Sequence, residues 1–122
     1  MNQGGTIVVA MQRLLDLFVE HCNERTTLEE LRQLLLERNS WRKAHDLFQR
    51  IRLKTLEATR QGDHLLEAQY LFEEICAKTI YNLSGQPAPF DADSPYWIVP
   101  TAFGLARKLR LEDREIIQII AH

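Results

Sequence analysis

The sequence predicts an all-α fold, a single irregular bundle of five to six helices, and three observations lead to that class. Apolar residues recur with helical periodicity through most of the first 84 positions. No run alternates apolar and polar residues over the length of a strand. The chain has 122 residues, 45% hydrophobic and 26% charged, as is usual for a globular domain with its own core. We therefore predict one domain over residues 1–122, with a flexible N-terminus at 1–5.

Two helices are predicted before residue 40, over residues 6–23 and from Thr27 to about residue 39. Thr6 follows two glycines and is the expected N-cap of the first helix. The second begins with Thr27 and Glu30, the spacing of a capping box, in which each side chain accepts from a backbone N–H of the other residue. The apolar stripe of the first helix is formed by Ile7, Met11, Leu14 and Phe18, and that of the second by Leu28, Leu31, Leu34 and Leu35.

The third and fourth helices, over residues 41–61 and 64–84, are predicted to form an antiparallel hairpin. Gly62 is suited to the left-handed residue that ends a helix, and Asp63 to the N-cap of the next one. A link this short leaves two helices only antiparallel packing. The third helix carries the most regular apolar stripe of the chain, formed by Trp41, Ala44, Phe48, Ile51, Thr55 and Ala58.

Residues 85–95 differ from everything before them, because glycine, three prolines and two aspartates mark a loop. A C-terminal helix pair is predicted after this Pro-rich loop, over residues 100–109 and 112–121. Pro100 is expected to restart the helix, since proline inside a helix removes a backbone hydrogen bond.

Patterns that signal catalysis or metal binding are missing from the sequence. The four histidines and two cysteines do not fall at zinc-ligand spacing, and no phosphate-binding glycine loop or nucleophile elbow is present. We therefore expect no cofactor and no metal, and the sequence favours a protein that is not an enzyme. Cys22 and Cys76 are interpreted as reduced, buried thiols. Glu73 and Glu74, beside Cys76, are interpreted as part of a solvated acidic face.

Charge is distributed unevenly along a chain whose net charge is only -2. Residues 38–60 carry +5, and residues 63–93 carry -5. One interpretation is that the two arms of the hairpin complement each other, which contributes little per exposed pair. The other is a basic patch for an anionic partner. Nucleic acid is not expected, because the excess is small and no reading motif accompanies it. The patch would consist of Arg42, Arg50, Arg52 and Lys54.

Aromatic residues gather around the Pro-rich loop, and they also have two interpretations. They either fold the loop back over the open end of the bundle or act as rigid anchors in an interface with a partner. The candidate anchors are Phe90, Tyr96 and Trp97, with Phe103 nearby.

The sequence therefore predicts a non-enzymatic protein-interaction module in the cytoplasm, since it shows neither a signal peptide nor a membrane span. A small bacterial-type immunity- or antitoxin-like binding protein would have this size. Homodimerisation is a separate expectation, because a short terminal helix cannot bury Ile116, Ile117, Ile119 and Ile120 on one side. The alternative is a small-molecule-binding or enzymatic bundle, with a pocket near the Pro-rich loop lined by His64, Tyr70, Tyr81, Tyr96 and Trp97.

Overall fold

The computed structural model describes residues 3–37, 41–83 and 97–121, and within these ranges the side chains from residue 7 onward. Every regular element in the described ranges is a helix, which confirms the predicted all-α fold. No helix in these ranges has both the length and the apolar character needed to cross a bilayer. The helices are α1 (Gln3–His21), α2 (Thr26–Leu36), α3 (Trp41–Gln61), α4 (His64–Leu83), α5 (Ile98–Lys108) and α6 (Asp113–Ala121).

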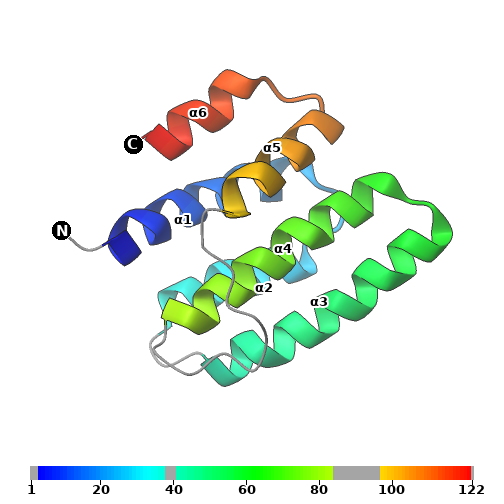
Figure 1. Cartoon of the computed structure of the whole chain (residues 1–122), viewed down its shortest axis with the longest axis horizontal. Coiled ribbons are helices and arrows are strands. Elements are labelled where there is room, and N and C mark those ends of the chain that lie inside the picture. Colours follow the sequence, from blue (N-terminus) through cyan, green and yellow to red (C-terminus); the bar gives the residue numbers. More distant parts are fainter. Residues whose placement is uncertain (1–2, 38–40, 84–96, 122) are drawn as a thin grey trace.

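Helix α4 lies in the middle of the bundle, with α3 along one side and α5 along the other (Figure 1). The contact between α3 and α4 is the most extensive one between any two helices. Helix α2 packs against α1, α3 and α4, and α6 packs against α1 and α5. Because α4 has neighbours on several sides, its buried positions are not confined to a single stripe.

The turn between α3 and α4 explains why these helices form a hairpin. Gly62 has a φ of 72°, the left-handed conformation that glycine adopts without steric cost. Its N–H donates to the Thr59 carbonyl at 3.1 Å, and the Asp63 N–H donates to the Ala58 carbonyl at 3.0 Å. Together these bonds form a Schellman motif. The Asp63 carboxylate then accepts from the Leu66 N–H at 3.1 Å and caps α4, which confirms the prediction for both turn residues.

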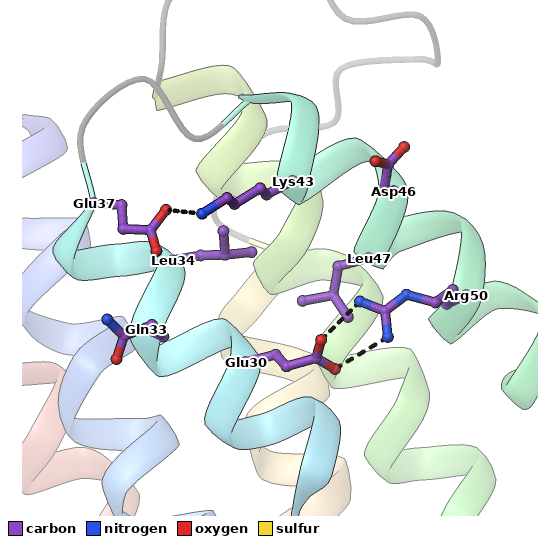
Figure 2. A pocket seen from close by; sticks show the side chains of 8 residues that line it. All are labelled: Glu30, Gln33, Leu34, Glu37, Lys43, Asp46, Leu47 and Arg50. Atoms are coloured by element: carbon purple, nitrogen blue, oxygen red, sulfur yellow. Dashed lines mark hydrogen bonds and ion pairs between the residues drawn. The ribbon is translucent and has the colours of Figure 1, made fainter.

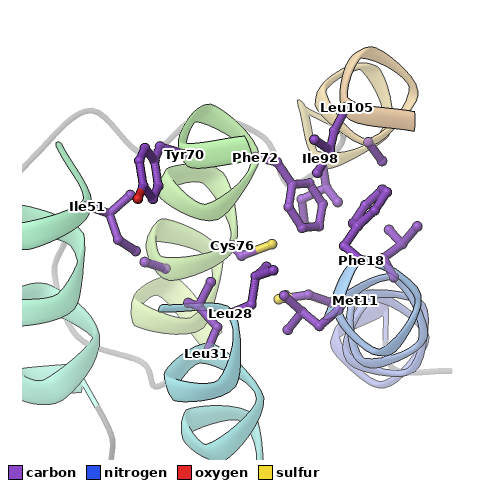
Figure 3. Packing of buried hydrophobic residues seen from close by; sticks show 14 of the residues in the cluster. Met11, Phe18, Leu28, Leu31, Ile51, Tyr70, Phe72, Cys76, Ile98 and Leu105 are labelled. Atoms are coloured by element: carbon purple, nitrogen blue, oxygen red, sulfur yellow. The ribbon is translucent and has the colours of Figure 1, made fainter. Parts of the chain in front are cut away.

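The core is apolar and draws on all six helices. Phe18 of α1 and Phe72 of α4 meet edge to face, with ring centroids 4.9 Å apart and planes at 76°. Figure 3 shows Phe72 pointing from α4 toward Phe18 on α1 and toward Ile98 and Leu105 on α5. Aromatic pairs in this geometry stabilise a core beyond the area that they bury. The Phe18–Phe72 pair therefore joins the hairpin to the first and fifth helices.

Several predicted helix boundaries are wrong. Helix α1 begins at Gln3, so Thr6 lies inside the helix and is not its N-cap. The capping box of α2 does not form, because the N-cap is Arg25, two residues before the predicted cap Thr27, and the helix begins at Thr26. Helix α5 begins at Ile98 and includes Pro100, which belongs to the first turn, where the helix does not need its N–H. The predicted loop at residues 85–95 lies outside the described residues.

Candidate functional site

The residues predicted to form a basic patch do not lie on one side of α3. Arg50 and Lys54 are four residues apart and share a flank. Arg52 is two residues from each of them, so it lies on the opposite flank. Arg42 is on the exposed side, where its guanidinium carbon lies 5.0 Å from the centroid of the Trp41 ring. The structure therefore divides the predicted patch into two parts.

Arg50 forms an ion pair with α2, whereas the sequence suggested charge complementarity between α3 and α4. Its two terminal nitrogens donate to the two carboxylate oxygens of Glu30 on α2, at 2.8 and 3.2 Å. The hydrogen bond to Glu30 raises the pKa of Arg50 above its usual value. A bidentate pair has better geometry than most exposed ion pairs. The charge complementarity seen in the sequence is thus realised between α3 and α2 at this position.

A cavity of about 260 Å³ lies between α2 and α3 around this ion pair. A second ion pair, Lys43 with Glu37 at 2.9 Å, lies at the other end of the cavity (Figure 2). Leu34 and Leu47 are buried between the two pairs. Four of its charged side chains are already paired with one another across the gap, so apart from Asp46 the cavity has little charge with which to recognise a ligand. The remaining lining residues are Gln33 and Asp46.

Arg52 and Arg42 differ from Arg50, because neither has a carboxylate within 4 Å among the described residues. Lys54 has none there either, although its charge lowers the pKa of the buried Glu73. Arg52 acts similarly on α4: its charge lowers the pKa of Glu74, which burial raises above the usual value. Arg52 therefore lies on the side of α3 that borders the exposed edge of α4.

Exposed leucines lie next to these arginines on the outer side of the hairpin. On α3, Leu53 is 68% exposed and Leu56 is 54% exposed; on α4, Leu71 is 42% exposed. The Thr59 hydroxyl donates to the Glu67 carboxylate and so joins the two helices on this side. We call this surface the hairpin outer face, and it consists of Arg42, Gln49, Arg52, Leu53, Leu56 and Thr59 of α3 with Glu67, Leu71 and Glu74 of α4.

The aromatic part of the predicted site is only partly described. Phe90 and Tyr96 lie outside the described residues. Trp97 is 55% exposed and precedes the first residue of α5. Because α4 separates α5 from α3, the structure does not bring Trp97 together with the arginines of α3 (Figure 1).

The pocket residues of the alternative function are also spread apart. His64 and Tyr81 both belong to α4 and are 17 positions apart, which is roughly 25 Å along a helix. Tyr70 and Tyr81 are buried, whereas His64 is exposed. A single small pocket cannot include both ends of α4.

Most of the α6 isoleucines that suggested a dimer pack in the core of the bundle. Ile116 is fully buried, and Ile119 and Ile120 pack against the core. Ile117 is 53% exposed. The apolar surface of α6 is therefore covered mainly by α1 and α5, and the dimer stays a prediction.

A buried polar cluster was missed by the sequence analysis, and it corrects the interpretation of Glu73. Glu73 is fully buried rather than solvated, because its side chain points into the contact between α4 and α2. Gln69 donates from its amide nitrogen to Glu73 at 2.8 Å and to the Glu24 carbonyl at 2.7 Å. Oε1 of Glu73 and Oγ1 of Thr27 are buried without a hydrogen-bond partner among the described residues. Burial raises the pKa of Glu73 to about 7.

A second cavity, of about 290 Å³, lies where the connection between α1 and α2 meets the start of α4. Gln69 lines this cavity and also donates to the buried Glu73, and Glu24 and Asp63 give the cavity an acidic character. The described residues contain no group of three side chains that could hold a metal ion. The cavity is completed by His21, Cys22, Asn23, Leu65 and Leu66.

Both cysteines are free and buried, as predicted. Burial raises the pKa of Cys22 to about 12 and that of Cys76 well above its usual value, and the charge of Glu73 adds to both effects. Since the thiolate is the reactive form, neither cysteine is suited to act as a nucleophile.

Comparison with known proteins finds no family model, no curated protein and no solved structure that matches this chain.

Proposed function

We propose that this protein is a non-enzymatic protein-interaction module and that the hairpin outer face is its docking surface. The observation that carries the proposal is the group of three exposed leucines, near two arginines that form no ion pair with a carboxylate among the described residues. Single exposed leucines are common on protein surfaces and need no explanation. Leu53, Leu56 and Leu71 all belong to the hairpin outer face, and exposed apolar residues gathered on one face with polar residues around them are typical of interaction sites.

The fold itself supports this proposal. The buried residues of α3 all lie on the opposite side of the helix, toward α4 and α2. Leu53 and Leu56 therefore contribute little to the core, and the bundle would gain solubility if both were polar. An immunity- or antitoxin-like inhibitor of another protein is the narrower form of the same proposal, and it would use the same face.

Site-specific photocrosslinking in cells of the source organism tests the proposal. A benzoylphenylalanine placed at Leu53 should give a discrete covalent adduct with another protein, because this position lies in the centre of the face. The matched control carries the same group at Val9, an exposed apolar residue of α1. An equal yield of the same adduct from both positions, or no adduct from Leu53, would contradict the proposal.

A further inference from the structure

We propose that Glu73 is a pH-sensitive switch, which keeps the connection between α1 and α2 closed against α4 while its carboxyl group is neutral and lets it open once the group is ionised. The connection consists of residues 22–25, between the end of α1 at His21 and the start of α2 at Thr26. We call these residues the α1–α2 junction. The switch is separate from the hairpin outer face and goes beyond the proposed function.

One side chain of α4 joins the junction to the buried carboxyl group. Nε2 of Gln69 donates to the Glu24 carbonyl at 2.7 Å and to Oε2 of Glu73 at 2.8 Å. A side-chain amide nitrogen carries two protons, so both donor positions of Gln69 are in use. Gln69 and Glu73 are both buried. The junction backbone and the Glu73 carboxyl group therefore share one anchor, and a displacement of Gln69 would release both.

The enclosure of Glu73 favours its neutral form. A carboxylate can accept about four hydrogen bonds, and the Gln69 amide supplies one of them. Oε1 of Glu73 is buried without a hydrogen-bond partner among the described residues, and so is Oγ1 of Thr27 on α2. Burying a charge with so few donors is costly, whereas a neutral carboxyl group needs fewer. Ionisation of Glu73 therefore favours any rearrangement that brings water to it.

The charged groups around Glu73 do not compensate for its ionisation. Burial has the largest effect and raises the pKa of Glu73 to about 7. Glu24 of the junction raises it further, Lys54 of α3 lowers it, and α2 contributes the Thr27 hydroxyl rather than a charge. The Glu73 charge in turn raises the pKa values of nearby groups that are neutral at pH 7, which are Cys22, Tyr70 and Cys76. Arg25 of the junction acts on Cys22 instead.

The second cavity provides the space into which the anchor can move. It has a volume of about 290 Å³, enough for several water molecules, and Gln69 lines it together with junction residues Cys22, Asn23 and Glu24. The same Gln69 side chain bonds Glu73. A movement of Gln69 toward the cavity therefore breaks both of its hydrogen bonds and admits water to the carboxylate.

The junction is the part of the surroundings of Glu73 that can open most easily. The N-cap of α2, Arg25, forms no hydrogen bond from its side chain to the first turn. Helix α2 has 11 residues, and its contact with α4 is far less extensive than the contact between α3 and α4. Local opening occurs where contacts are fewest. Ionisation of Glu73 is therefore relieved at the junction, and the hairpin stays closed.

The direction and size of the pH effect follow from the two states of Glu73. In the open junction the carboxyl group is solvated and has its ordinary pKa of 4.5, against about 7 in the closed one. The closed state binds the proton more tightly, so opening is rarest below pH 4.5, increases as the pH rises and becomes constant above about 7. Between pH 4.5 and pH 8 the opening equilibrium constant should rise roughly 100-fold.

Amide hydrogen exchange, measured by NMR on the full chain, tests the switch. The Cys22 N–H donates to the Phe18 carbonyl at 2.8 Å and the Glu29 N–H to the Arg25 carbonyl at 2.9 Å, so these two amides flank the junction. Their protection factors, corrected for intrinsic exchange, should fall roughly 100-fold between pH 4.5 and pH 8 and depend little on dilute urea. Constant protection across this range would overturn the inference. So would protection and urea dependence equal to those of Ile51 in α3, because the junction would then open only by global unfolding.

Two neighbouring carboxyl groups provide a matched pair of variants. Glu73→Gln should make the protection of both junction amides nearly independent of pH. Glu74→Gln removes the adjacent carboxyl group, which is affected by Arg52 and Thr55 of α3, and should keep the pH dependence of the wild type. A pH dependence that survives in Glu73→Gln, or one that both variants abolish equally, would show that Glu73 is not the switch.

Discussion

Replacing Glu73 with glutamine should stabilise the protein above neutral pH, and the expected size follows from the burial of this carboxyl group. Glutamine has the same shape and keeps an oxygen in place to accept from the Gln69 amide. Its amide nitrogen can also donate to the Thr27 hydroxyl oxygen, which has no hydrogen-bond partner among the described residues. The substitution therefore removes the buried charge without creating a cavity.

Burial raises the pKa of Glu73 from 4.5 to about 7, and Glu24 adds to the rise. The nearby Thr27 hydroxyl, which does not reach hydrogen-bond geometry, the hydrogen bond from Gln69 and the charge of Lys54 offset part of it. The folded state thus binds the proton more tightly than the unfolded state. The stability that this provides is fully present below pH 4.5 and is lost as the pH rises through about 7. At about 1.4 kcal/mol per pKa unit, the loss between pH 4.5 and pH 8 is about 3 kcal/mol.

Urea unfolding measured at several pH values tests this reasoning. The free energy of unfolding of Glu73→Gln, minus that of the wild type, should increase by about 3 kcal/mol between pH 4.5 and pH 8. Glu20→Gln, at an exposed position of α1, is the control and should show a nearly flat difference. Parallel pH profiles for the wild type and Glu73→Gln would refute the reasoning, because a solvated carboxylate gives that result.

Three further predictions concern the turns and the thiols. Gly62→Ala should lower the free energy of unfolding by about 1 kcal/mol, since alanine is strained at a φ of 72°, and thermal melts would detect the change. Arg110→Gly should have the opposite effect and raise the stability by up to about 1 kcal/mol, because Arg110 has a φ of 63° in the turn after α5; a lower melting temperature would contradict this. Cys22 and Cys76 should react slowly with an aromatic disulfide reagent in the native protein and quickly in urea, and fast reaction of both native thiols would show that they are not buried.

The hairpin could be predicted from sequence because its determinants are local. The apolar spacing of α3, Gly62 and Asp63 all act within one or two turns of the backbone, so they can be read without knowing the neighbours. The start of α5 was predicted too late for a related reason. Pro100 has two local interpretations, a break and a place in the first turn, and the contacts of Ile98 with the core decide between them.

The site could not be predicted in the same way, because its residues depend on contacts distant in sequence. Arg50 and Glu30 are 20 residues apart, and nothing near either residue indicates the pairing. Glu73 did leave a signal. It lies between Gln69 and Cys76 at spacings of four and three, which continues a buried row of α4. The spacing alone places Glu73 in a buried row. The adjacent Glu74 made the two residues look like an acidic surface pair, which led to the interpretation that both are solvated.

The contrast between α3 and α4 links the buried cluster to the proposed interface. Helix α4 is surrounded by neighbours, so even its polar residues Gln69 and Glu73 are enclosed and affect stability. Helix α3 lies at the edge of the bundle and uses only one side for packing. Leu53 and Leu56 lie on its other side and do not take part in this packing. Changing them to serine should leave the free energy of unfolding within about 0.5 kcal/mol of the wild type, so any loss of binding in these variants is attributable to the face itself.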